Sequence, residues 1–247
     1  MAQTALITGA TSGIGRATAE LMADAGYNLV LCGRREERLQ ELQRALSGKV
    51  EVRTLAFDVR DQAAVNAALA NVGAIDVLVN NAGNAHGLAP IHEGDVEDWE
   101  AMLDINVKGV LYVTKAITPG MVARKQGQII NVGSVAGKEV YPNGNVYCAS
   151  KHALDAINQG LRMELYTHGI RVGAINPGLV ETEFSEVRFK GDSSRAEKVY
   201  QGFDALQAHD VAETILFMVT RPAHVNLADV LIFPTAQAAS TMVYRKG

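Results

Sequence analysis

Cysteine and tryptophan are scarce in this sequence, and long apolar runs are absent from it. Its 247 residues include two cysteines, Cys32 and Cys148, and one tryptophan. Two cysteines are too few for the disulfide framework of a secreted domain, and no secretory signal precedes them, so we expect reduced thiols in a cytoplasmic protein. No apolar run reaches about 18 residues, the length that a membrane-spanning helix requires. We therefore expect neither a disulfide scaffold nor a membrane-embedded protein.

An excess of positive charge is also lacking. The formal net charge is −4, which argues against a general nucleic-acid binder and against attachment to anionic membranes. The six histidines are scattered and show no metal-ligand spacing, so no metal site is expected. With 48% apolar and 20% charged residues, the composition is that of an ordinary globular protein whose length suits one α/β domain.

Short apolar segments alternate with helical patterns along most of the chain. Strands are expected at 5–8, 29–32, 50–56, 77–79, 128–132, 171–176 and 230–233. Helices are expected from 14 to the stop at Gly26, at 36–46 and 61–72, from about 96, from 147, and at 210–220. Strands that alternate with helices of ten or more residues indicate βαβ units and a parallel sheet. The prediction is one doubly wound α/β domain spanning 1–247.

The longest interruption of this pattern is the segment 178–209. It mixes polar and aromatic residues and follows the end of an expected strand, where open α/β sheets bind ligands. Long segments between core elements often form lids or binding regions. We therefore expect residues 178–209 to form a substrate-binding lid.

A glycine-rich turn follows the first expected strand and opens the first helix. It reads Thr8-Gly9-Ala10-Thr11-Ser12-Gly13-Ile14-Gly15, a Gly-x-x-x-Gly-x-Gly spacing. Glycines permit the tight turn and let backbone N–H groups approach a pyrophosphate at the helix N-terminus. This context predicts a dinucleotide site, although a turn that merely packs on the sheet is the alternative.

The second expected strand ends in Cys32-Gly33-Arg34-Arg35. An NAD-specific site usually carries an acidic residue here for the adenosine ribose, whereas guanidinium groups bind a 2′-phosphate strongly. Arg34 and Arg35 therefore favour NADP over NAD, unless they pair with Glu36, Glu37 or Glu41 on the helix that follows. Asp58 and Val59, just after the third strand, are expected to contact adenine.

Tyr147 and Lys151 are spaced four residues apart in an expected helix, so they share one face. A nearby ammonium favours phenolate and brings a tyrosine proton closer to its working range. A shift of roughly 3 pKa units needs about 4 kcal/mol, which one surface lysine does not supply. The pair alone could be an ordinary solvated face. As a functional pair it requires a partly buried site.

Several motifs together resemble the short-chain dehydrogenase/reductase family over nearly the whole chain. They are the glycine turn, Asn80-Asn81-Ala82-Gly83, Asn106, Ser134, Tyr147 with Lys151, and Pro177-Gly178. The resemblance implies a Rossmann fold with seven parallel strands and helices on both faces. It also implies an oxidoreductase that is usually tetrameric.

The resemblance assigns a role to each matching position. Tyr147 would act as the general acid or base, Lys151 would hold the nicotinamide ribose and lower the Tyr147 pKa, and Ser134 would hydrogen-bond the substrate oxygen. Asn106 would orient a water that carries protons from Lys151. The residue patterns and the family resemblance together imply a set of cofactor contacts. They are Gly9, Thr11, Ser12, Gly13, Ile14, Gly15, Arg34, Arg35, Asp58, Val59, Asn80, Ala82, Gly83, Tyr147, Lys151, Pro177, Gly178, Val180 and Thr182.

Finer motifs are similar to bacterial NADP-dependent 3-hydroxy acid dehydrogenases. They include Gly33-Arg34-Arg35-x-x-Arg38-Leu39, Asp98-Trp99, and the run from Glu183 to Asp192. The implied substrates are serine, L-allo-threonine, 3-hydroxyisobutyrate or the matching semialdehydes. The alternatives are a broad NADPH-dependent aldehyde or ketone reductase and a non-catalytic NADP-binding sensor.

A carboxylate substrate requires a positive charge beyond the catalytic set. Arg188 and Lys190 are the nearest candidates in sequence, and we expect Arg188 to bind the carboxylate. Equally open at this point is a role for both residues in subunit contacts or in closing the lid.

Overall fold

The computed structural model describes residues 2–246, and its centre is a seven-stranded parallel sheet. The strand order is β3-β2-β1-β4-β5-β6-β9. Their bounds are β1 Thr4–Thr8, β2 Asn28–Gly33, β3 Val52–Ala56, β4 Val77–Asn80, β5 Gly127–Val132, β6 Ile170–Pro177 and β9 Asp229–Ile232. The predicted α/β class and the seven parallel strands are thus confirmed.

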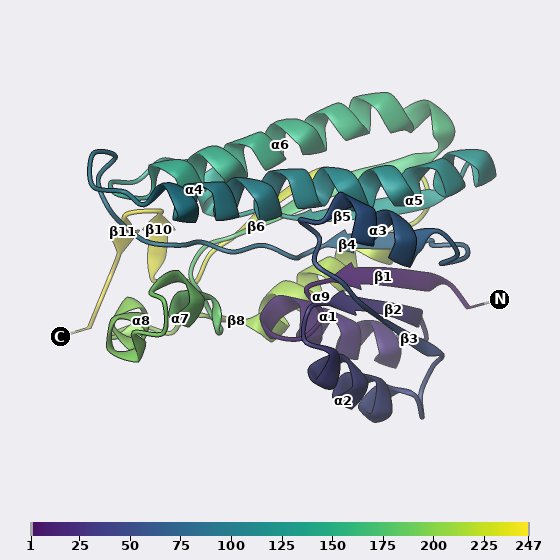
Figure 1. Ribbon diagram of the computed structural model, residues 1–247, viewed down its shortest axis with the longest axis horizontal. Helices are drawn as coiled ribbons and strands as arrows, with labels where there is room; N and C mark the ends of the chain where they lie inside the picture. Colours follow the sequence, from purple (N-terminus) through teal and green to yellow (C-terminus); the bar gives the residue numbers. More distant parts are fainter. Residues whose placement is uncertain (1, 247) are drawn as a thin grey trace.

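Helices cover both faces of the sheet (Figure 1). On one face lie α1 (Gly13–Asp24), α2 (Glu36–Leu46) and α9 (Ala208–Val219); on the other lie α3 (Gln62–Leu69), α4 (Val96–Leu103), α5 (Val110–Arg124) and α6 (Asn145–Leu165). Side chains that alternate along β1 enter different cores: Ile7 packs with α1, α2 and α9, whereas Leu6 packs with α3 and α5. Alternation with a period of two is what a strand buried on both faces requires.

The helix expected from about residue 96 contains an irregular turn that the sequence pattern did not predict. Between α4 and α5 the backbone forms a π-helical turn, η1 (Asp104–Gly109), with Asn106 buried in it. Such turns are rare and frequently lie at functional sites, because the extra residue re-aims a side chain.

The segment 178–209 has structure of its own. It contains the short strands β7 (Val180–Glu181) and β8 (Leu206–Gln207), which pair with each other, and the helices α7 (Phe184–Arg188) and α8 (Ser193–Tyr200). Figure 1 shows α7 and α8 beyond the carboxyl ends of the sheet strands. The remaining elements are the 3-10 turns η2 (Val135–Gly137) and η3 (Tyr166–His168) and the hairpin of β10 (Gln237–Ala239) and β11 (Met242–Val243).

Across residues 2–246, none of the helices combines the length and the apolar character that crossing a membrane requires.

Candidate active site

Helix α6 carries Tyr147 and Lys151 into the interior. Both side chains are buried, with 7% and 6% exposed, so the pair does not lie on a solvated face. The ammonium of Lys151 lies 6.0 Å from the centroid of the Tyr147 ring and donates to the Val132 carbonyl at the end of β5, at 3.0 Å. Gly144 precedes the helix, and a Cβ there would lie 2.0 Å from the Tyr141 ring, so glycine lets that ring fold against the helix start.

Burial shifts the two pKa values in opposite directions. It lowers the pKa of Lys151 to about 8, because the charged ammonium loses solvation. It raises the pKa of Tyr147 above its ordinary value, and the neighbouring Tyr141 adds to this rise. A hydrogen bond with Ser134 and the positive charge of Arg188 oppose the rise. Burial therefore favours the protonated phenol by raising the pKa of Tyr147.

Ser134 is separated from the end of β5 by Gly133 and caps the turn η2. Its hydroxyl accepts from the Ala136 N–H at 3.1 Å, and its side chain lies beside Tyr147 in the wall of one cleft. Because β5 runs through the middle of the parallel sheet, the serine emerges at the carboxyl edge, where ligands bind in such folds.

The π-helical turn aims Asn106 at the loop after β4. Its amide nitrogen donates to the Asn84 carbonyl at 2.8 Å and to the Ser150 hydroxyl at 3.0 Å, and its oxygen accepts from the Asn84 N–H at 2.9 Å. A Cβ on Gly83 would lie 2.9 Å from the Asn106 oxygen and 3.5 Å from the Lys151 nitrogen. Asn106 and Lys151 therefore both lie close to the space beside Gly83.

A cleft of about 520 Å³ runs along the carboxyl edge of the sheet past these residues. Most of the expected cofactor residues line it: Gly9, Thr11, Ser12, Gly13, Ile14, Arg34, Arg35, Asp58, Val59, Ala82, Gly83, Tyr147, Lys151, Pro177, Gly178, Val180 and Thr182.

Two expected cofactor residues do not line the cleft. Asn80 is buried, and its amide donates to Thr114 and Asn131, both at 2.9 Å. Gly15 packs against the turn itself, where a Cβ would lie 2.4 Å from the Gly9 carbonyl oxygen. Both residues shape the cleft wall from behind.

The glycine turn fits a pyrophosphate. Gly9 and Gly13 have φ values of 66° and 50°, which favour glycine, and Thr182 lies 3.3 Å from the site of a Gly13 Cβ. Ser12, at the N-cap of α1, makes no side-chain cap bond to the helix, and its hydroxyl accepts from Arg35 at 2.8 Å. The N-terminal amides of α1 are therefore directed at the cleft without a competing side-chain cap. No group of metal-ligating side chains occurs among residues 2–246.

The arginines after β2 are held by partners distant in sequence. Arg35 donates to the Thr11 hydroxyl at 3.2 and 3.0 Å and pairs with Glu183 at 2.9 Å, and Arg38 pairs with Glu183 at 2.7 Å. Arg34 lies 3.8 Å from Asp58. Within residues 2–246, neither Arg34 nor Arg35 forms an ion pair with Glu36, Glu37 or Glu41.

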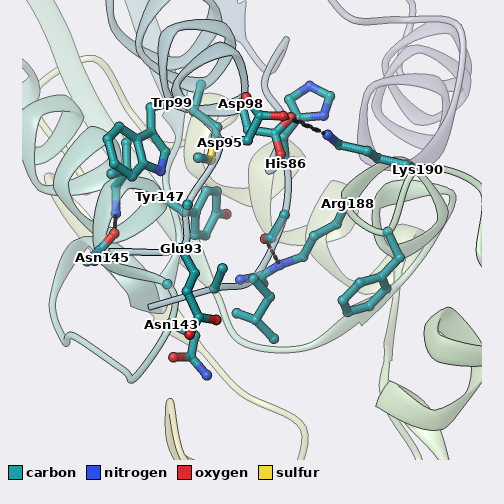
Figure 2. Close-up of a pocket in the computed structure, with 18 of the residues that line it drawn as sticks. His86, Glu93, Asp95, Asp98, Trp99, Asn143, Asn145, Tyr147, Arg188 and Lys190 are labelled. Carbon is teal, nitrogen blue, oxygen red and sulfur yellow. Dashed lines mark hydrogen bonds and ion pairs between the residues drawn. The ribbon is translucent and has the colours of Figure 1, made fainter. Parts of the chain in front are cut away.

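Arg188 and Lys190 lie in different surroundings (Figure 2). Arg188 extends toward Tyr147, with its guanidinium 5.6 Å from that ring centroid and 5.5 Å from that of Tyr141. Its Nε donates to the Gly87 carbonyl at 3.4 Å, while its Nη2 is buried without a hydrogen-bond partner in the described chain. Lys190 instead pairs with Asp98 at 3.0 Å and Asp95 at 3.3 Å. Of these two cations, Arg188 is thus the one directed at Tyr147.

A second pocket of about 270 Å³ adjoins the cleft on the outer side of Tyr147 and Arg188 (Figure 2). Its wall includes Trp99, Glu93 and Asn143. Since Tyr147 and Arg188 line both cavities, this outer pocket is an extension of the same site.

No sequence pattern assigned a partner to Tyr141 or to Glu183, although Glu183 lies in the expected lid segment 178–209. Each acts through a contact with a residue far along the chain, Arg188 for Tyr141 and Arg35 for Glu183. Neither lies in a periodic or glycine pattern that would have indicated its position.

The parallel sheet, the glycine turn and the Ser134, Tyr147 and Lys151 arrangement define a dinucleotide-dependent dehydrogenase class. The profile described as short chain dehydrogenase matches residues 3–193, and the chain belongs to this family.

Particular relatives are similar along their entire lengths. The chain is 46% identical to the NADP-dependent 3-hydroxy acid dehydrogenase YdfG of Escherichia coli K12, covering 98% of this chain and 99% of the relative. It is 45% identical to sulfoacetaldehyde reductase 2 of Chromohalobacter salexigens, covering 97% of each. A structure described as the closed form of serine dehydrogenase complexed with NADP+ superposes with a TM-score of 0.92 at 44% identity, covering 99% of this chain and all of that one.

Proposed function

We propose that this protein is an NADP-dependent dehydrogenase that oxidises small 3-hydroxy acids or 3-hydroxy amino acids, or reduces the matching semialdehydes. The observation that carries the proposal is the buried Nη2 of Arg188, which lacks a partner in the described chain and belongs to a guanidinium centred 5.6 Å from the centroid of the Tyr147 ring. A substrate carboxylate would satisfy that donor while its hydroxyl carbon faces Tyr147 and Ser134. The relatives named for 3-hydroxy acid and serine dehydrogenation support the same class.

Tyr147 would exchange the substrate hydroxyl proton, and Ser134 would donate a hydrogen bond to the same oxygen. Charge builds on that oxygen during carbonyl reduction, and two preorganised donors stabilise it in a site that excludes water. Lys151 and Asn106, which meet at Gly83, would conduct the proton onward through a water. The cofactor supplies the hydride or accepts it.

The turn at Gly9 to Gly15 would hold the pyrophosphate, and Arg34, Arg35 and Arg38 would take the 2′-phosphate. Guanidinium groups suit that phosphate because they bind it bidentately. Within a single domain, the segment 178–209 would close over the nicotinamide, with the Val180 backbone and the Thr182 hydroxyl on its carboxamide. We further propose a cytoplasmic homotetramer, supported by the family resemblance.

Initial rates with a substrate panel test the proposal. The panel is L-serine, L-allo-threonine, 3-hydroxyisobutyrate and neutral alcohols of similar size, each with NADP+ and NAD+. We expect activity with the acids and preference for NADP+. Turnover of neutral alcohols alone would indicate the broad reductase, and cofactor binding without turnover of any alcohol or aldehyde would indicate the sensor. A preference for NAD+ would refute the proposal that Arg34, Arg35 and Arg38 bind the 2′-phosphate.

A further inference from the structure

Ser134 is held by a chain of hydrogen bonds that leads away from the cleft. Its backbone N–H donates to the amide oxygen of Asn176 at 3.2 Å, and the Asn176 amide nitrogen donates to Asp229 at 2.5 Å. Asn176 belongs to β6 and Asp229 to β9, the two strands that follow β5 in the sheet. The catalytic serine is thus connected to the edge strand.

The amide of Asn176 is locked in one orientation. Asn176 is 2% exposed, and Asp229 as a carboxylate only accepts hydrogen bonds, so it takes the amide nitrogen and leaves the oxygen for Ser134. A Cβ at position 133 would lie 2.0 Å from that oxygen, so glycine is required for the approach. Geometry and chemistry both assign this amide to the serine turn.

Asp229 also holds the far end of the same turn. Its second oxygen lies 2.6 Å from the ammonium of Lys138, which follows η2 directly. The same ammonium lies 2.6 Å from Asp155 of α6, the helix that carries Tyr147. Asp229 therefore clamps the turn from Ser134 to Lys138 at both ends and links it to the tyrosine helix.

We infer that Asp229 and Asn176 are positioning residues that set the Ser134 hydroxyl relative to Tyr147. Neither residue lines the cleft, so each acts on it only through the Ser134 turn. The inference rests on the proposed function, in which Ser134 orients the reacting oxygen. Displacing a catalytic donor by about 1 Å costs up to about 100-fold in rate, so a loss of this clamp is costly.

A double-mutant cycle tests the inference with NADP+ and 3-hydroxyisobutyrate. We expect Asp229→Ala to lower kcat about 10- to 100-fold, and to lower it less than about twofold further when Ser134→Ala is already present. The Kd for NADP+ should stay unchanged. An equal loss in both backgrounds would overturn the positioning role while leaving the proposed function intact. If Ser134→Ala kept the kcat of the wild type, both the positioning role and the proposed function of Ser134 would be refuted.

Asp155→Ala is the matched control, because it removes a partner of Lys138 but leaves the bonds from Asp229 to Asn176 and Lys138. We expect it to change kcat less than about threefold. If Asp155→Ala lowered kcat as much as Asp229→Ala, the ion pairs of Lys138 and not the Asn176 amide would account for the loss of kcat. That result would overturn the inference.

A reciprocal exchange keeps the test valid if Asp229→Ala fails to fold. Asn176→Asp alone brings two carboxylates together, whereas adding Asp229→Asn restores a donor facing an acceptor and leaves an oxygen for the Ser134 N–H. We expect the exchanged pair to recover at least about tenfold in kcat over Asn176→Asp. Recovery of thermal stability without recovery of kcat would contradict the inference.

Discussion

At the scale of single residues, the main question is which cation meets the substrate. Arg188 lies between two tyrosine rings with a free donor in the described chain, whereas Lys190 is neutralised by two aspartates. Charge alone did not distinguish them in the sequence. Their surroundings in the folded chain support our proposal that Arg188 binds the carboxylate.

We expect Arg188→Ala to raise KM for 3-hydroxy acids and to lower kcat/KM about 10- to 100-fold, since a hydrogen bond to a charged group contributes about 1.5–3 kcal/mol. For neutral alcohols, kcat/KM should fall much less. Steady-state kinetics of both substrate types measures this, with Lys190→Ala as the control of equal charge change. An unchanged KM for the acids would refute carboxylate binding by Arg188.

The titration of Tyr147 gives a second prediction at this scale. Burial holds its pKa above the ordinary value in the cofactor-free protein, and a positive nicotinamide ring would favour the phenolate. We expect NADP+ to lower the Tyr147 pKa and NADPH, whose ring is neutral, to lower it less. Ultraviolet titration of wild type against Tyr147→Phe isolates this group. Equal titration with both cofactor forms would argue against the effect.

At the scale of elements, the segment 178–209 is tied to the helix after β2. Glu183 precedes α7 and pairs with Arg35 and Arg38, both near the start of α2. These pairs are half exposed, so each contributes modestly, about 0.2–1 kcal/mol. Together they tie the start of α7 to the start of α2.

We expect Glu183→Gln to accelerate hydrogen exchange in α7 and α8 by roughly two- to thirtyfold, the factor that two exposed ion pairs supply. Mass-spectrometric exchange of peptides from 184–200 measures it. Glu186→Gln is the control, since Glu186 lies in the same helix and forms no ion pair in the described chain. Equal acceleration in both variants would show that Glu183 does not anchor the segment.

At the level of the whole molecule, we expect the buried ammonium of Lys151 to reduce stability. Burial lowers the Lys151 pKa from 10.5 to about 8, so below pH 8 folding keeps a buried cation at a cost of about 3 kcal/mol. Between pH 8 and 10.5 the unfolded chain binds more protons than the folded one, so this cost falls as the pH rises.

We expect Lys151→Met to abolish turnover and to raise the free energy of unfolding at pH 7 by about 1–3 kcal/mol. The gain comes from removing the buried charge, and it is limited because the hydrogen bond to the Val132 carbonyl is lost as well. The gain over wild type should shrink toward pH 10. Urea unfolding at both pH values measures it. A gain that does not depend on pH would exclude the buried ammonium as its cause.

The amino-acid sequence alone predicted the seven strands of the main sheet and most of the helices between them, because hydrophobic periodicity is a local property of the chain. The glycine turn was predicted from its position after the first strand. Tyr147 and Lys151 were paired by their helical spacing, whereas the set that joins them to Ser134 came from the family resemblance. The expected boundaries of these elements were less accurate. The strand expected at 50–56 begins at Val52, and the helix expected at 61–72 ends at Leu69.

Three features came from long-range packing alone. They are the π-helical turn at Asn106, the position of Arg188 instead of Lys190 beside Tyr147, and the contacts of Asp229 that hold the Ser134 turn. Each depends on partners far apart in the chain: Asn106 on Asn84, Arg188 on Gly87, and Asp229 on Asn176. Such contacts exist only after the sheet has brought separate strand ends to one edge, and no local pattern encodes them.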